Sequence, residues 1–475
     1  MSNSKLIKIC ALAIALYVIV AVSFYFISGD QLRYSFNESA MVNASNVVGE
    51  ILSSQVLEQP VKVNADEITG LGIYAATYAR ENSGLLNVEL VSDGIVIAES
   101  KVEISGMLDN SEFYLPINAS ISGKDKIIVR ITAPESEPGN AITLYYGNKI
   151  TNPDLDESNF ALINGEELDG ELCLRLYTRN FLFTGKYYWL IVAVVFLALI
   201  GCGAYIVKCN AAGKATAVVN LIAAFYKYKY LIKQLVNRDF KTKYKRSVLG
   251  VLWSFLNPLL TMSVQYVIFS TLFKTDIPNF VVYLLIGVVC FNFFSEATTM
   301  ALSSIIGNAA LITKVYVPKY IYPLTRVMSS AINFLLALIP LFTVVIITQT
   351  PFRASFLLLP LPIICLFLVC LGIGLLLSSS MVFFRDTQFL WGVLSMLWMY
   401  ATPIFYPETI IPASIMPLFK CNPLYHIIRF MRIAIIQGVS PEPKAYGLML
   451  LSTVIPLFIG LFVFKKTQDK FVLNI

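Results

Sequence analysis

Five basic residues follow one another closely in the middle of the chain, and their chemistry is the binding of anions. They are Arg238, Lys241, Lys243, Lys245 and Arg246. A basic cluster beside a membrane attracts anionic headgroups by about 1 kcal/mol per residue. The cluster therefore indicates either a site for the pyrophosphate of a lipid at the inner leaflet or simply the cytoplasmic side of a membrane protein.

Residues for catalysis or metal binding are missing from the sequence. It contains no H-E-x-x-H, G-x-S-x-G or G-x-x-x-x-G-K-[ST] motif. The single histidine, His426, excludes a multi-histidine metal site, and no cysteines are spaced as C-x-x-C. We therefore expect no catalytic residue, metal or cofactor in this chain, and an energy source outside it.

Glu296 is the clearest ionisable residue within the predicted membrane spans. Ion-coupled carriers usually place several ionisable residues at such positions. Their scarcity favours a separate ATPase as the source of energy. Glu296 itself is open to three interpretations: a structural or gating role, a substrate contact, or proton coupling.

Aromatic residues recur at helical spacing in two predicted spans. The residues concerned are Tyr266, Phe269 and Phe273 in one span, and Trp391, Trp398 and Phe405 in or next to another. Leu394 continues the second face. Aromatic faces stack on sugar rings with weak directionality and so tolerate sliding, which suits a pathway for an elongated glycan. Ordinary packing in a core or against lipid explains the same spacing.

The elements that must position these residues belong mostly to a membrane. Hydrophobic residues form 57% of the 475, charged residues only 14%, and the mean hydropathy is +0.69. Residues 28–186 are different, because they hold 23 acidic and 11 basic residues. An acidic soluble domain is thus joined to a basic, apolar remainder, as the positive-inside rule predicts for a membrane protein.

Eight apolar stretches are long enough to be read as membrane spans. The first, 6–27, is followed by no A-x-A-like cleavage site, so we expect an uncleaved helix within domain 1–27 and not a signal peptide. The second is 187–207. The other six are 249–273, 280–303, 326–349, 354–380, 389–405 and 446–464.

The segment 28–186 has the pattern of an extracytoplasmic all-β domain. Short β-branched and aromatic runs alternate with turn residues about every ten positions, which predicts a β-sandwich or jelly roll. The fold class expected for the whole chain is an α-helical polytopic membrane protein with this β-domain added. Basic loops place both termini in the cytoplasm of a bacterial cell.

Two further segments complete the predicted domains. Residues 208–248 contain an amphipathic interface helix, because apolar residues recur near 3.6 spacing among lysines. Within the membrane core 249–475, the segment 404–445 is too apolar for a loop and too rich in proline for a span. We expect short helices in 409–419 and 424–437, folded as a re-entrant hairpin on the outer side.

Several ordered motifs carry a resemblance to a known family. The run Asp239–Pro258 (DFKTKYKRSVLGVLWSFLNP) resembles the opening of ABC-2 type permeases, in particular the O-antigen and teichoic-acid (polysaccharide) exporters. Asn308–Pro323 and Phe383–Asp386 are similar to that family's cytoplasmic loops. Ala401–Glu408 and Asn422–Arg432 are similar to its outer re-entrant region. The matches span about half the chain and leave the β-domain outside.

The resemblance implies a homodimeric transport subunit that works with two copies of a soluble ATPase, which binds the ATP and Mg. It implies that loop 308–323 is a coupling helix, whose apolar and basic mixture suits a groove on a partner. An ordinary basic loop is the alternative. The predicted coupling residues are Asn308, Leu311, Ile312, Lys314, Val315, Tyr316, Arg385 and Asp386. For the last two, a local ion pair at a helix end is equally consistent.

The β-domain leaves its role open. Tyrosines that suit sugar stacking are Tyr74, Tyr78, Tyr114, Tyr145, Tyr146 and Tyr177. Such residues also fill sandwich cores, and the domain would then scaffold the complex or dock wall enzymes. For the whole chain we expect export of a lipid-linked polysaccharide. The alternatives are export of drugs or small lipids, a non-transporting glycan receptor or scaffold, and a membrane glycosyltransferase.

Overall fold

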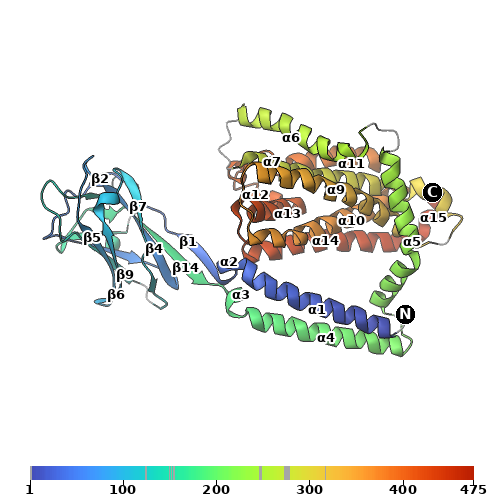
Figure 1. The fold of residues 1–475 in the computed structure, drawn as a ribbon, viewed down its shortest axis with the longest axis horizontal. Helices are drawn as coiled ribbons and strands as arrows, with labels where there is room; N and C mark the ends of the chain where they lie inside the picture. Colours follow the sequence, from blue (N-terminus) through green and yellow to red (C-terminus); the bar gives the residue numbers. More distant parts are fainter. Residues whose placement is uncertain are drawn as a thin grey trace. The chain divides into compact units, whose positions relative to one another are not determined.

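A computed structural model describes residues 3–123, 126–148, 150, 152, 156–214, 216–244, 249–271, 279–315 and 317–474. The chain divides into two units, a helical unit of Met1–Leu32 with Trp189–Ile475 and a β unit of Arg33–Tyr188 (Figure 1). Four of the predicted site residues lie outside the described residues: Lys245, Arg246, Phe273 and Tyr316.

The β unit contains two antiparallel sheets. The larger has the order β1 (Tyr34–Glu38), β14 (Leu174–Phe181), β4 (Glu67–Ala76), β10 (Thr143–Asn148) and β13 (Gly170–Leu172), with β2 (Asn46–Val47) on β10, and with β7 (Ser111–Leu115) and β8 (Ala119–Ser120) on β4. The smaller has the order β12 (Glu166–Glu167), β11 (Leu162–Ile163), β3 (Val56–Lys62), β9 (Lys126–Thr132), β5 (Leu85–Ser92) and β6 (Ile95–Glu103).

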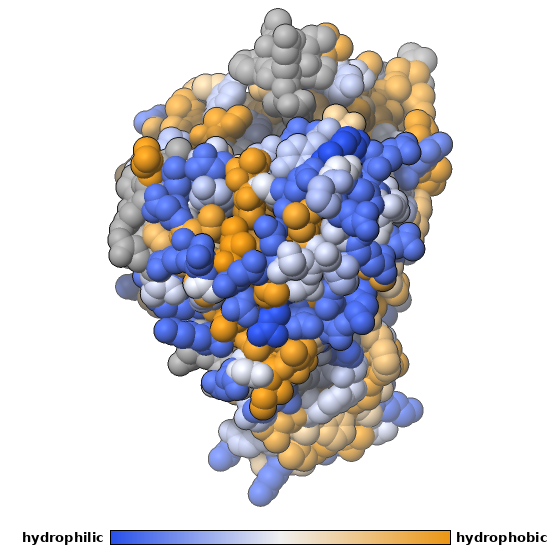
Figure 2. Space-filling view, turned by 90° about the vertical axis from the view of Figure 1, so that its left-hand side faces the viewer, coloured by the Kyte–Doolittle hydropathy of each residue, from blue (hydrophilic) through white to orange (hydrophobic). Residues whose placement is uncertain are grey.

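Alternation along the strands explains how the two sheets pack. In β9 the residues Ile127, Val129 and Ile131 are buried, and in β4 the residues Leu71 and Ile73 are buried. Side chains of both sheets join one apolar core, as in a β-sandwich. The predicted all-β sandwich is therefore confirmed. Hydrophilic residues cover much of the surface that faces the viewer in Figure 2.

The helical unit is made of long apolar helices. Six helices in the described part of the chain are long and apolar enough to cross a membrane: α1 (Asn3–Ser28), α4 (Tyr188–Ala211), α7 (Phe280–Leu302), α9 (Ile321–Ile347), α10 (Pro360–Phe383) and α14 (Pro443–Thr467). The other two predicted spans form shorter helices, α6 (Trp253–Thr271) and the 14-residue α11 (Thr387–Tyr400). At 1.5 Å per residue α11 is about 21 Å long, less than a hydrocarbon core.

Close backbone contact holds α10 and α14 together. A Cβ added to Gly460 of α14 would lie 1.9 Å from the carbonyl oxygen of Gly372 in α10. Lipid tails are as apolar as leucine, so helices in a bilayer associate through such close packing of small residues. Helix α7 packs against α9 and α10 and is buried along most of its length.

Helices α1 and α4 form an antiparallel pair. The Tyr17 hydroxyl donates to the Val192 carbonyl oxygen at 3.1 Å, and the Asn210 amide donates to Asn3 Oδ1 at 2.5 Å. Most of their surface is exposed within the protomer, and it is apolar. Phe24 of α1 contacts Tyr446 of α14 with ring centroids 5.2 Å apart, so the pair is attached to the bundle through α1.

Helix α5 (Ala217–Tyr244) runs across one end of the bundle of long helices (Figure 1). Its buried residues Ile232, Leu235 and Val236 lie three and four positions apart and form one face. They join a separate apolar cluster with residues of α9, α10 and α14. The amphipathic pattern therefore covers the end of the bundle with its apolar face and leaves most of its lysines exposed.

The segment between α11 and α14 contains two short helices, α12 (Met416–Lys420) and α13 (Pro423–Arg432), and α13 continues into a π-helical turn, Ile433–Gln437. Nearly all of α13 is buried. Asn422 caps α13, because its Oδ1 accepts from the Leu424 amide at 2.9 Å.

Candidate functional site

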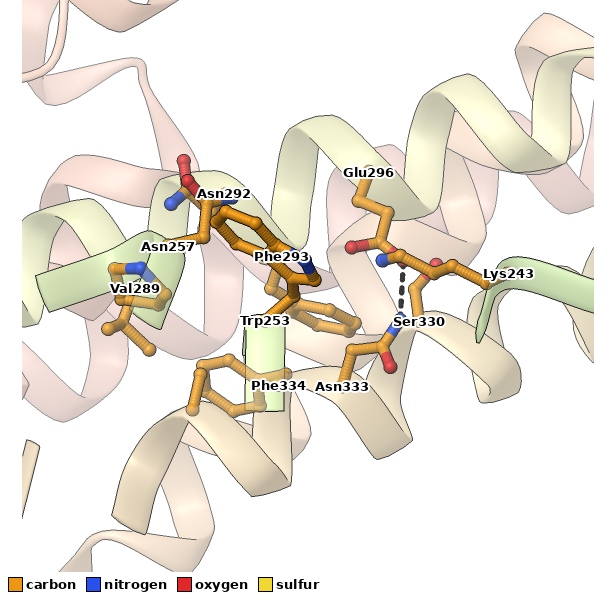
Figure 3. A pocket seen from close by; sticks show the side chains of 12 residues that line it. Lys243, Trp253, Asn257, Val289, Asn292, Phe293, Glu296, Ser330, Asn333 and Phe334 are labelled. Atoms are coloured by element: carbon orange, nitrogen blue, oxygen red, sulfur yellow. Dashed lines mark hydrogen bonds and ion pairs between the residues drawn. The ribbon is translucent and has the colours of Figure 1, made fainter. Parts of the chain in front are cut away.

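A cavity of about 270 Å³ opens between α6, α7, α9 and the last turn of α5. Two helices present one face each, with residues at positions i, i+3, i+4 and i+7. The lining residues of these faces are Val289, Asn292, Phe293 and Glu296 in α7, and Ser330, Asn333, Phe334 and Ala337 in α9. Trp253, Asn257 and Pro258 of α6 complete the wall (Figure 3).

The polar end of the cavity is organised around Glu296. Its Oε1 accepts from Lys243 Nζ at 2.8 Å and from Asn333 Nδ2 at 2.7 Å, and the three side chains point toward one another in Figure 3. The Lys243 and Glu296 side chains are 42% and 29% exposed. The carboxylate therefore faces the cavity as half of an ion pair, and α5 is linked to α7 through it.

Part of the remaining wall of the cavity is aromatic. Phe293 and Phe334 stack with ring centroids 4.8 Å apart. Apolar faces combined with a few convergent polar groups are typical of small-molecule sites. A carboxylate accepts hydrogen bonds, an ammonium group donates them, and an amide does both. The cavity can therefore hold a single polyhydroxylated ring, with hydroxyls at the Glu296 end and C–H groups against the phenylalanines.

A second polar cluster ties α5 to α9 and to the loop after α7. Asp239, buried in α5, forms ion pairs with Arg238 at 3.0 Å and with Arg326 of α9 at 3.1 Å. Arg238 also donates to Asn308 Oδ1 at 3.2 Å, and Asn308 donates to the Ser304 carbonyl oxygen at 2.7 Å. One buried carboxylate thus holds two arginines and, through them, three segments. We call Arg238, Asp239, Asn308 and Arg326 the Asp239 cluster.

The predicted coupling segment begins at the Asp239 cluster. A 3-10 turn, Ile306–Asn308, leads into one helical turn, α8 (Ala309–Ile312). Leu311 and Ile312 are half-buried against the apolar cluster under α5, whereas Lys314 and Val315 are exposed. Asn308 is buried, so it anchors the segment and is not part of its surface.

The two predicted coupling loops meet the same short helix. Lys319 Nζ lies 5.9 Å from the centroid of Phe471 in α15 (Phe471–Asn474), and the Phe383 ring lies 6.1 Å from it. Lys319 also donates to the Gln468 carbonyl oxygen at 2.6 Å. Arg385 and Asp386 follow Phe383; both are exposed, and neither takes part in an ion pair within the described part of the chain. The local ion pair considered for them is therefore absent.

An apolar groove with a basic rim lies between α5 and α9. It measures about 540 Å³ and is lined by Phe225, Lys229, Ile232, Lys233, Val236, Asn237, Phe240, Met328 and Ile332. The predicted anion-binding residues Arg238 and Lys243 are both engaged in ion pairs, while Lys241 is exposed. Lys229 and Lys233, spaced i and i+4, stand at the groove and are additional candidates for an anionic headgroup.

The predicted pathway aromatics differ in their surroundings. Phe269 and Phe405 stack with centroids 5.3 Å apart, and Trp391 and Trp398 both contact Phe294 of α7. Trp391 and Phe405 are buried in the protomer, and Phe269 and Trp398 are half-buried against the same core. Tyr266 is 39% exposed and Leu394 is 51% exposed. Leu394 is thus at the exposed edge of the helix face whose tryptophans contact α7.

Arg432 of α13 is almost completely buried. Arg432 donates to the carbonyl oxygens of Tyr283, Pro403 and Ile404 at 2.7 to 3.3 Å, and its guanidinium lies 3.3 Å from the centroid of the Tyr283 ring. The side chain joins α13 to α7 and to the turn after α11. Its partners are carbonyl dipoles, so it is a structural clamp.

In the β unit, the structure separates the predicted tyrosines into two groups. Tyr74, Tyr114, Tyr145 and Tyr177 lie on the outer face of the larger sheet, in two pairs with ring centroids 5.0 and 5.1 Å apart. Tyr146 instead packs against the core, and Tyr78 lies in the loop after β4 under the Arg80 guanidinium. Desolvation and the neighbouring Glu112 carboxylate raise the pKa of Tyr177, so its hydroxyl stays protonated.

Several residues of these sites were not predicted from sequence. Asn333 and Arg326 are polar residues in or at the edge of an apolar span, and a polar residue at such a position indicates a functional or structural partner. Their partners, Glu296 and Asp239, are 37 and 87 positions away, and no local pattern shows such pairs. Among the described residues, no group of three or more His, Cys, Asp or Glu side chains is placed to hold a metal ion.

The helical unit combines long apolar helices with the amphipathic α5 across one end and the buried short helix α13. Residues 230–436 match the model of the ABC-2 type transporter family. This match begins within α5 and ends in the π-helical turn after α13, so the strands lie outside it. The chain belongs to the ABC-2 type transporter family.

Similar proteins include bacterial export permeases. The chain is 32% identical over 251 residues to the O-antigen export system permease protein RfbA of Klebsiella pneumoniae, which covers 52% of this chain and 96% of the relative. It is 28% identical over 257 residues to RfbA of Myxococcus xanthus (54% and 98%). It is 24% identical over 250 residues to the polysialic acid transport protein KpsM of Escherichia coli (52% and 97%).

Proposed function

We propose that this chain is the membrane subunit of an ATP-driven exporter that moves a lipid-linked polysaccharide out of a bacterial cell. Support for the cargo comes from relatives named for O-antigen export and for polysialic acid transport, which this chain matches over nearly their whole length. An exporter of small lipids or drugs is the second candidate. It would need no site for sugar hydroxyls, so the Glu296 cavity favours the polysaccharide.

The proposed complex contains two copies of this chain and two copies of a soluble ATPase. The sequence holds no P-loop, so ATP and Mg bind in the partner, and this chain catalyses no reaction. Both termini, α5 and the two coupling loops face the cytoplasm in this proposal. The β unit lies outside the cell, and the exposed apolar faces of α1 and α4 contact lipid.

The Asp239 cluster is the observation that carries the coupling mechanism. A partner that pushes on Lys314 and Val315 moves a segment anchored through Asn308 and Arg238 to Asp239. Because Asp239 also pairs with Arg326, the displacement reaches α5 and α9 together. A buried carboxylate that loses one arginine is left poorly compensated, so the segments of the cluster are costly to separate.

Substrate entry is assigned to the two concave sites beside α5. The groove offers an apolar floor for the lipid and Lys229 and Lys233 for its pyrophosphate, with the exposed Lys241 nearby on the same helix. The adjoining cavity, with Glu296, Lys243 and Asn333, is assigned to a sugar ring next to the pyrophosphate. Tyr266 is the candidate for the pathway surface because it is exposed, whereas Phe269, Trp391, Trp398 and Phe405 pack against the core.

The test of this proposal is co-purification from native membranes in mild detergent, followed by measurement of ATPase activity and of glycan at the cell surface. We expect an ATPase subunit to accompany the wild-type protein. Lys314→Glu reverses the charge of the coupling surface and is expected to release the ATPase or to lower surface glycan at least about tenfold. Lys444→Glu, an exposed lysine at the start of α14 on the opposite side in this topology, is the matched control.

Two further variants separate coupling from substrate contact. Asp239→Asn is expected to keep the ATPase bound but to uncouple hydrolysis from export. Glu296→Gln is expected to reduce export while coupling remains intact. Two results together would overturn the exporter proposal in favour of a glycan receptor or scaffold. The protein would purify without any ATPase, and deletion of its gene would leave surface glycan unchanged.

A further inference from the structure

Two glycines in the middle of β4 are covered by side chains of the neighbouring strand. Leu71, Ile73 and Ala75 of β4 face the core, so Gly70 and Gly72 face the outside of the sheet. A Cβ on Gly70 would lie 2.4 Å from the ring of Tyr114, and one on Gly72 would lie 2.4 Å from Glu112 Oε1. The outer face of β4 is thus a floor across which Tyr114 and Glu112 of β7 lie.

Four tyrosines stand in two pairs along this floor. Tyr74 pairs with Tyr145, and Tyr114 with Tyr177, with ring centroids 5.0 and 5.1 Å apart. Strand register places Tyr177 opposite Gly70, four residues from Tyr74 on β4. At 3.3 Å per residue the two pairs are about 13 Å apart. We call these four residues the tyrosine row.

Hydrogen bonds hold the tyrosine row rigid. The hydroxyls of Tyr74 and Tyr145 donate to the carbonyl oxygen and Oδ1 of Asn110 at 3.0 and 2.5 Å. At the other end, Tyr114 donates to the Thr69 carbonyl oxygen at 3.2 Å, and Tyr177 donates to Glu112 Oε1 at 3.0 Å. The rings therefore lose little conformational freedom when a ligand binds, which favours affinity.

The space between the pairs is polar, and one arginine stands there between two glutamates. Arg175 of β14 lies opposite Gly72 and forms ion pairs with Glu112 at 3.1 Å and with Glu38 of β1 at 3.3 Å. Guanidinium and carboxylate groups offer donors and acceptors to hydroxyls, and the one carboxylate in excess disfavours an anionic ligand. Tyr114 is about half exposed, so at least one ring is open to solvent.

We propose that the tyrosine row binds a neutral oligosaccharide segment that lies along β4, with sugar rings on the two tyrosine pairs and hydroxyls on Glu112 and Arg175. The separation of the pairs exceeds one sugar ring, so the occupant is a chain and not a monosaccharide. Because the chain is proposed to export a glycan, the expected ligand is a segment of that cargo, and in this respect the inference rests on the proposed function. A protein partner would need a flatter, more apolar centre than this ion-paired one.

The experiment uses the full-length protein in nanodiscs and measures binding to immobilised oligosaccharides. The probes form a length ladder prepared by partial hydrolysis of the surface polysaccharide of the host cell. We expect the affinity of the wild type to rise with length until the chain covers both pairs. Tyr74→Ala and Tyr114→Ala are each expected to weaken binding about tenfold, the size of one aromatic contact.

Two matched variants act as controls. Tyr114→Phe keeps the ring and loses only the hydroxyl, so it is expected to bind within about threefold of the wild type. Tyr78→Ala removes a tyrosine that is 41% exposed in the same unit but lies in the loop after β4, outside the row, and is expected to bind as the wild type does. A thermal melt of each variant checks folding. If Tyr114→Ala unfolds the β unit, Tyr74→Ala still tests the tyrosine row.

The proposal is overturned when the wild type binds no member of the ladder, or when Tyr78→Ala weakens binding as much as Tyr114→Ala. It is also overturned when row variants keep glycan binding but release a co-purifying protein, which would make the row a protein-docking surface. A coupling variant that loses export but still binds glycan supports this inference. If no ATPase co-purifies but the protein still binds glycan, only the proposed function is contradicted.

Discussion

The interior of the helical unit and the outer face of the larger sheet in the β unit both combine aromatic rings with an arginine. In one region these groups are buried, and in the other they lie at the surface. In the helical unit, Trp391 and Trp398 pack against Phe294, and Arg432 is enclosed by carbonyl oxygens. In the β unit, the tyrosine row lies on the surface, and Arg175 stands between two glutamates. The hydroxyl makes the difference, because a tyrosine can be anchored by a hydrogen bond and still present its ring to solvent.

This comparison is sharpest for the two arginines. We expect Arg432→Gln to destabilise the protein by at least about 4 kcal/mol, because a glutamine amide replaces only part of four hydrogen bonds and leaves buried carbonyls without donors. Arg175→Gln should cost at most about 1 kcal/mol, as for other surface ion pairs. Thermal unfolding in nanodiscs measures both. Equal losses would mean that Arg432 does not act as a clamp.

Two tryptophans test the interior aromatics in the same unit. Trp391→Ala is expected to cost about 3 kcal/mol, because the cavity left beside Phe294 cannot collapse fully. Trp189 of α4 is half-exposed and lies next to Tyr25 of α1, so Trp189→Ala is expected to cost less than about 1 kcal/mol. The measurement is again the unfolding midpoint, with yield after extraction as a second readout. A stable Trp391→Ala that fails in export would place Trp391 in the pathway itself.

The smallest expected effect is one of pH on the β unit. Asp109 accepts from the Thr77 amide at 2.6 Å, which lowers the pKa of this carboxyl from its ordinary 3.8. Its stabilising contribution is therefore complete above about pH 4 and is lost as pH falls through the lowered pKa. In contrast, the carbonyl partners of Arg432 do not titrate.

The measurement is the melting temperature of the β unit in the full-length protein at pH 5 and pH 3, for the wild type and for Asp109→Asn. We expect a smaller decrease in the variant. Burial raises the pKa of Glu171, so the contribution of Glu171 to stability changes with pH in the opposite direction. The wild type and the variant are therefore compared at each pH. An identical decrease in both proteins would show that the Asp109 contact contributes nothing to stability.

Much of the fold could be predicted because it follows from local patterns. The strand KIIVRIT matches β9 residue for residue, the span 280–303 matches α7 closely, and the lysine-rich amphipathic pattern matches α5. Each pattern consists of the spacing of apolar residues and the polarity of the residues between them, and both can be read from neighbouring positions in the sequence. The β-sandwich and the helical membrane class follow from them.

The sites were harder to predict because they depend on partners that are distant in sequence. Spacing placed Trp391 and Leu394 on one face, but it could not show which side of α11 meets α7. Likewise, Arg238 was predicted as an anion-binding residue because its neighbours are basic, and the structure pairs it with Asp239 and Asn308. A pattern identifies a face of a helix, whereas only the packed structure identifies what that face contacts.

The pairing of β1 with β14 has a consequence for the history of the chain. These strands are the first and last of the β unit, and Tyr34 stands opposite Phe181 in an antiparallel ladder. Cα atoms of such opposed residues are about 5 Å apart, so the polypeptide enters and leaves the unit through adjacent points. A tight turn could bridge them. Recombination could therefore remove this module, or exchange it for another, without stretching the α1–α4 hairpin, and related exporters could acquire different modules at the same position.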